Sequence, residues 1–135
     1  MSLRRVLLVK IWVTTILWCA PLLTFSGSLF RFVGLPVPTP IVFARLLGAA
    51  YAALIVVYVH GVGELDGGRF PVTAVRVGLV SNGLAAVLLA LYGIRGAWSS
   101  WPWRGQLFMW GSLAATILLA GAIFLAGRQP SRDRP

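Results

Sequence analysis

Residues that could carry out chemistry are scarce in this chain. Its 135 residues include one histidine, one cysteine and three carboxylates. General acid–base catalysis needs positioned titratable groups, and a zinc site needs three or four ligands within reach of one ion. The sequence holds no Ser/His/Asp set, no cysteine pair and no glycine-rich phosphate loop. It therefore predicts a protein that is not an enzyme and that holds no metal or cofactor.

His60 is the one candidate for a cofactor ligand, because a single histidine can be an axial ligand to haem or a related pigment. It has no companion ligand in the sequence. An interfacial or hydrogen-bonded histidine is the simpler interpretation. The lone Cys19 excludes an internal disulfide.

The composition is that of a membrane protein. Hydrophobic residues make up 59% of the chain and charged residues 11%, whereas about 25% of a soluble domain is charged. The mean hydropathy is +0.86. The apolar residues gather into four segments, at about 8–27, 41–60, 72–94 and 105–127. Each has the ~20 residues that cross a bilayer as a helix.

These segments predict an all-α fold, namely a four-helix transmembrane bundle with short loops and both termini on the same side. Residues 1–135 would form a single integral membrane domain. Arg4 and Arg5 could open a signal peptide, but the following apolar stretch is long and lacks a small-x-small cleavage site. The first segment is therefore expected to remain as a span.

The charges predict how the bundle is oriented. The net charge is +9, and eight of the twelve basic residues fall on the side that holds the termini. The eight are Arg4, Arg5, Lys10, Arg69, Arg76, Arg128, Arg132 and Arg134. The positive-inside rule then puts both termini in the cytoplasm, as expected for a bacterial inner-membrane protein. Because the basic residues lie at span ends, nucleic-acid binding is not expected.

Acidic residues are confined to the predicted cytoplasmic side. Glu64 and Asp66 are expected to neutralise Arg69 or Arg76, and Asp133 lies near the C-terminus. The outer side would hold four arginines and no carboxylate. Those four are Arg31, Arg45, Arg95 and Arg104.

Arg45 is the charge that stands out, because it lies near the start of the otherwise apolar second span. Its guanidinium could snorkel to the outer headgroups. Alternatively it could bind an anion: a lipid phosphate, an acid of a partner or a substrate. Arg76 is its inner counterpart. Together with Arg95 and Arg104, these two are the candidate contacts for an anion, a lipid headgroup or a partner.

Asn82 is a polar residue near the centre of the third span. An amide at this depth is expected to hydrogen-bond to a neighbouring helix, with a substrate cavity as the alternative. Small residues spaced four apart predict close helix contacts. The pairs are Gly48 and Ala52, Ala49 and Ala53, Gly78 and Asn82, Ser81 and Ala85, and Gly111 and Ala115, with Ser112 and Thr116 beside the last pair.

The loop "WSSWPWRG" places Trp98, Trp101 and Trp103 together between Arg95 and Arg104. Tryptophan favours the membrane interface, so an aromatic belt is one interpretation. The other is a docking surface for another membrane subunit, since tryptophan and arginine often anchor interfaces.

Three stretches carry a family resemblance: "GLPVPTPIVFARLLGAAYAALIVVY", "VSNGLAAVLLALYG" and "WRGQLFMWGSLAAT". They resemble small bacterial four-helix integral membrane proteins of uncharacterised function, loosely DoxX-like in size and layout. The resemblance implies the four-helix layout. It brings no catalytic signature and assigns no residues.

Two functions are compatible with these features. The first is a non-catalytic accessory or assembly subunit that packs against a larger membrane complex, with membrane lipids and other membrane subunits as its partners. The alternative is a small carrier or channel for an anionic or lipid-like solute, with Arg45, Asn82 and Arg76 along its path. A subunit should tolerate Asn82→Ala but lose its partner on Trp101→Ala or Trp103→Ala. A carrier should show the reverse.

Overall fold

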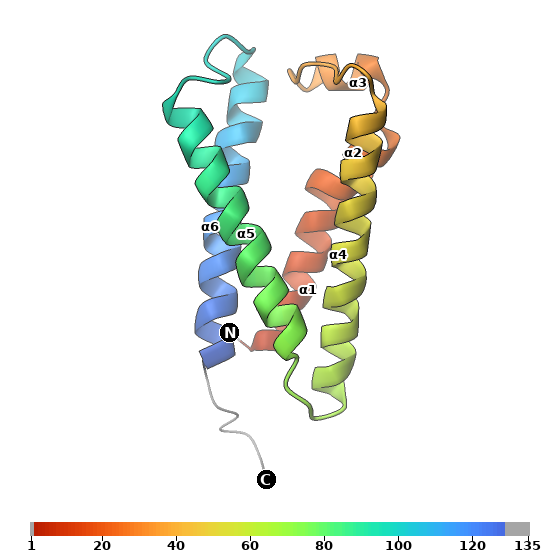
Figure 1. Ribbon diagram of the computed structural model, residues 1–135, viewed down its shortest axis with the longest axis vertical. Coiled ribbons are helices and arrows are strands. Elements are labelled where there is room, and N and C mark those ends of the chain that lie inside the picture. Colours follow the sequence, from red (N-terminus) through yellow and green to blue (C-terminus); the bar gives the residue numbers. More distant parts are fainter. Residues whose placement is uncertain (1, 129–135) are drawn as a thin grey trace.

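A computed structural model describes residues 2–128, and all its regular structure is helical (Figure 1). The elements are α1 (Leu3–Thr14), the π-helix η1 (Thr15–Cys19), α2 (Ala20–Thr24), α3 (Gly27–Phe32), α4 (Val42–Asp66), α5 (Val72–Ile94) and α6 (Trp103–Arg128). Four segments are long and apolar enough to cross a membrane: Leu3–Thr24, α4, α5 and α6. The predicted all-α, four-helix fold is confirmed.

The first span is a continuous helix whose winding widens at η1. Pro21 lies just after this segment and has no N–H to donate. In a regular α-helix its ring would collide with the carbonyl four residues earlier, at Leu17. A π-turn before the proline is a common way to relieve such a conflict.

The four spans form two helix pairs. The first span packs along α4, and α5 packs along α6. At one end the pairs meet in a buried cluster, formed by Leu3, Val6, Leu7, Tyr58, Ala74, Ile123 and Ala126. Toward the other end they diverge (Figure 1). Within the described helices, no Cα atom of η1 or α2 lies within 8 Å of one in α5 or α6.

Small residues allow close contacts at two of the three glycines for which such contacts are predicted, Gly48 and Gly78. A Cβ added to Gly78 would lie 2.8 Å from Ile123 Cδ1, and one added to Gly48 would lie 2.8 Å from Leu23 Cγ. Gly111 differs, because an added Cβ there would meet nothing within 4 Å. The inward face of α6 instead carries the buried Ser112 and Thr116.

The two pairs touch again beyond the region where they diverge. Gly34 follows α3 with a φ of 79°, and its carbonyl lies so close to Gly105 that a Cβ on Gly105 would collide with it. Arg104 Nη1 also donates a hydrogen bond of 3.3 Å to the Phe32 carbonyl. The helix pairs are therefore joined at both ends and separated between them.

Candidate functional site

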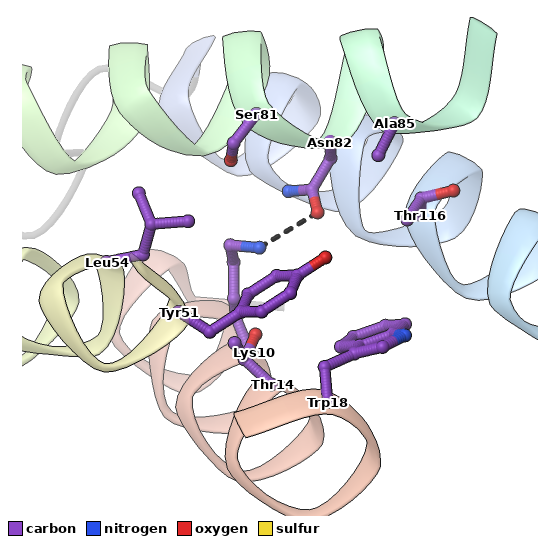
Figure 2. Close-up of a pocket in the computed structure, with 9 residues that line it drawn as sticks. All are labelled: Lys10, Thr14, Trp18, Tyr51, Leu54, Ser81, Asn82, Ala85 and Thr116. Carbon is purple, nitrogen blue, oxygen red and sulfur yellow. Dashed lines mark hydrogen bonds between the residues drawn. The ribbon is translucent and has the colours of Figure 1, made fainter. Parts of the chain in front are cut away.

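The centre of the site is a lysine hydrogen-bonded to an asparagine inside the bundle. Lys10 of α1 is 3% exposed, and its Nζ donates to Asn82 Oδ1 of α5 over 2.8 Å (Figure 2). The same Nζ lies 4.8 Å from the centroid of the Tyr58 ring. Asn82 Nδ2 donates to the Gly78 carbonyl over 2.7 Å, which fixes the amide so that its oxygen faces the lysine.

A small cavity of about 30 Å³ adjoins this hydrogen bond. All four spans contribute to its walls. The lining residues are Lys10, Thr14, Trp18, Tyr51, Leu54, Ser81, Asn82, Ala85 and Thr116 (Figure 2). Trp18 and Tyr51 stack with ring centroids 6.1 Å apart and form an aromatic wall.

Thr14 contributes a polar atom without a partner. Its side chain is 2% exposed, and its Oγ1 makes no hydrogen bond to any residue the structure describes. Lys10, Thr14 and Trp18 are spaced four apart, so they share one face of the first span. Lys10 and Thr14 therefore lie on the same wall of the cavity.

No carboxylate neutralises Lys10 within residues 2–128. The carboxylate of Asp66 pairs with Arg4 over 2.7 Å, not with Arg69 or Arg76 as the sequence predicts. Glu64 Oε1 lies 3.9 Å from His60 Nε2. The predicted position of Asp133 lies outside the described residues, as do those of Arg132 and Arg134.

The predicted location of Lys10 is wrong. Its place near the N-terminus predicts a cytoplasmic anchor at the membrane surface. The structure places it in the interior instead, because α1 begins at Leu3 and Lys10 lies more than a turn further along it, facing α5.

Arg45 has partners that the sequence did not indicate. It is partly buried, with Nη1 donating to the Leu22 carbonyl over 2.6 Å and Nη2 to the Phe25 carbonyl over 2.7 Å. These carbonyls belong to the end of α2, where helical acceptors lack partners. Arg45 thus caps α2 and joins it to α4. It does not line the cavity.

The other predicted arginines do not gather at one site. Arg76 and Arg95 are exposed on α5 and just after it. Arg104 lies over two aromatic rings, with its Cζ 5.3 Å from the Phe32 centroid and 5.6 Å from that of Trp103. Arg45, Asn82 and Arg76, which the carrier hypothesis places along one solute path, therefore do not line a common cavity. Only Asn82 lines the cavity beside Lys10.

The three loop tryptophans take different positions. Trp98 is 4% exposed and packs edge-on against Trp110, with the two ring centroids 5.6 Å apart. Trp103, in contrast, is 69% exposed. Trp101 is partly buried and lies 6.4 Å from Trp98. Only Trp103 presents a large surface to the surroundings.

His60 lies apart from the cavity, with 74% of its side chain exposed. No group of three or more histidine, cysteine or acidic residues that could hold a metal is present in the part of the chain that the structure describes.

Lys10, Thr14 and Trp18 of the first span, and Tyr51 of α4, line the site but were not singled out from the sequence. One signal could have indicated the first three: a lysine within the predicted span 8–27, followed by a threonine and a tryptophan at helical spacing. A charge inside a span is by default a candidate functional residue.

Comparison with protein-family models, with curated proteins and with solved structures finds no match to this chain. The resemblance to DoxX-like proteins therefore stays a prediction.

Proposed function

We propose that this chain is an integral membrane protein that binds an anionic or lipid-like solute between its two helix pairs and acts as a small carrier. The observation that supports it best is the buried Lys10, held by Asn82 beside a cavity and facing no described carboxylate. The same proposal includes a bacterial inner membrane, cytoplasmic termini and no catalytic role.

The physical argument concerns the unused hydrogen-bonding capacity of Lys10. An ammonium group has three N–H donors, and Asn82 accepts from one of them. The face of the Tyr58 ring lies close enough to attract the ammonium group as a cation. A charged group in apolar surroundings is costly unless it is paired. An anion in the adjoining cavity would supply the missing partner, and Thr14 would donate a further hydrogen bond.

Native mass spectrometry of the protein, extracted gently from its own membrane without overexpression, tests this proposal. We expect the chain alone or as a small homo-oligomer, carrying a bound small molecule of defined mass. Lys10→Met should lose that added mass, whereas Arg76→Met should keep it, because Arg76 is exposed and does not line the cavity. A wild-type protein with no bound molecule would contradict the proposal.

The accessory-subunit function is a second candidate, favoured by one surface. Phe32 and Trp103 are each 69% exposed and flank Arg104 where α3 meets the start of α6. Exposed aromatic and arginine side chains are common anchors of interfaces. If the extracted protein appears within a larger assembly, Trp103→Ala should weaken that association.

A further inference from the structure

We infer that the cavity beside Lys10 binds the carboxylate head of a single-chain amphiphile, with the apolar chain lying between the helix pairs. This inference rests on the proposed function and narrows its solute to one chemical class. The shared chemistry is a carboxylate, which a small soluble acid could also provide, and the experiment below separates the two sources.

The size of the cavity favours a small head group. A cavity needs a volume of roughly 10–15 Å³ to hold one water molecule. About 30 Å³ therefore admits a group of roughly two or three heavy atoms. A carboxylate, with three heavy atoms, matches this size.

The available donors match a carboxylate. Lys10 and Thr14 line the same wall one helical turn apart, and Thr14 Oγ1 is buried without a partner among the described residues. Two oxygens of one carboxylate could accept from these two donors. The carboxylate would then neutralise the amine and satisfy the buried hydroxyl together.

The helix pairs diverge on the side of the cavity that faces away from the buried cluster. Along each span, the cavity residues lie nearer the diverging end than the residues of the buried cluster: Trp18 lies beyond Leu7, and Ala85 beyond Ala74. The cluster closes the converging end. Toward the other end, η1 and α2 stay clear of α5 and α6 (Figure 1).

The walls at the cavity are suited to the first methylene groups of such a chain. Leu54 and Ala85 are apolar, and Trp18 and Tyr51 present stacked rings. An uncharged lipid would leave Lys10 unneutralised. The arrangement therefore favours a head group with one negative charge.

The test is a native mass spectrometry titration of the full chain in nanodiscs with four separate probes. These are oleate, oleyl alcohol, acetate and phosphatidylglycerol. We expect one oleate per chain, and binding of oleyl alcohol at least about tenfold weaker, because one charge-assisted hydrogen bond has that effect. Acetate should bind more weakly still, since it has no chain to bury.

Three variants locate the binding. Asn82→Asp would give Lys10 an internal carboxylate, so oleate affinity should fall about tenfold or more. Thr14→Val keeps the side-chain shape, removes the unpartnered hydroxyl and should weaken oleate binding several-fold. Thr15→Val is the matched control, because the Thr15 hydroxyl already donates to the Ile11 carbonyl over 2.7 Å. Circular dichroism and gel filtration check that each variant folds.

The outcomes separate this inference from the proposed function. Equal binding of oleate and oleyl alcohol, or loss of binding in Thr15→Val but not in Thr14→Val, overturns the inference. Preferred binding of acetate or phosphatidylglycerol overturns the carboxylate amphiphile but leaves the proposed anionic or lipid-like solute. If the wild-type protein binds none of the four probes and no molecule from its own membrane, both fail.

Discussion

At the scale of single residues, the interior of the bundle depends on a hydrogen bond between two side chains far apart in the sequence. Lys10 and Asn82 are both less than 5% exposed, and they join the first span to α5. Losing one partner leaves the other buried without its hydrogen bond, which is more costly than losing both. The pair should therefore behave as a unit in mutational tests.

We expect Asn82→Leu to destabilise the protein by about 1–3 kcal/mol, because the Lys10 amine loses its acceptor. In a Lys10→Met background the same change should cost less than about half as much. Reversible unfolding in sodium dodecyl sulfate, measured for both single variants and the double variant, gives this double-mutant cycle. Simple additivity would show that the pair is not coupled.

Arg45 also acts at the residue scale, through the two carbonyls that it caps near the end of α2. We expect Arg45→Met to destabilise the protein by about 1–3 kcal/mol, because carbonyls that lose a charged donor in apolar surroundings stay unpaired. Arg45→Lys should be only a partial rescue, since one ammonium does not reproduce the two-armed guanidinium fork. Thermal unfolding in detergent measures both changes, and a wild-type melting temperature for Arg45→Met would refute the capping role.

At the scale of helices, the two pairs are held together where small residues meet. A Cβ on Gly61 of α4 would lie 2.5 Å from the Cβ of Ala74 in α5. Real Cβ atoms do not approach so closely, so the helices would have to move apart. Two residues further along α4, a Cβ on Gly63 would meet nothing within 4 Å.

This difference provides a matched pair of substitutions within one helix. Gly61→Ala should destabilise the contact between α4 and α5 by about 1–3 kcal/mol through overpacking. Gly63→Ala should be neutral or slightly stabilising, because alanine favours the helix more than glycine does. The melting temperatures of the two variants in the same detergent decide the question. Equal effects would show that the contact at Gly61 is not tight.

At the scale of the whole molecule, α1 begins and α6 ends at the same end of the bundle, since Leu3 and Ala126 share one buried cluster. Arg4 and Asp66 are at that end, and the tryptophan loop is at the other. The excess of basic residues then predicts that the end holding Leu3 faces the cytoplasm.

Cysteine labelling in intact cells tests this orientation. In a Cys19→Ser background, Ser99→Cys in the tryptophan loop should react with a membrane-impermeant maleimide added outside. Gly67→Cys, between α4 and α5, should react only after the membrane is permeabilised. Gly67 has an ordinary φ of −86°, and an added Cβ would lie 3.5 Å from its nearest neighbours. The opposite pattern would place the termini outside.

Much of the architecture follows from the sequence alone. The length and hydropathy of four segments determine four helices, because the hydrocarbon core requires every backbone group to be paired within its own segment. The small residues at Gly48 and Gly78 also indicate close helix packing. These features are local or periodic, so they can be recognised without knowing the neighbours of each helix.

The tertiary structure alone decided which polar groups meet. Spans that are apolar around most of their surface do not reveal their rotation, so the sequence does not show which neighbours Arg45 and Lys10 face. Packing turned Arg45 toward the carbonyls of α2 and Lys10 toward Asn82, 72 positions away in the sequence. The candidate site depends on that pairing, because a hydrogen bond between distant helices is set by their mutual rotation and depth, which no local pattern specifies.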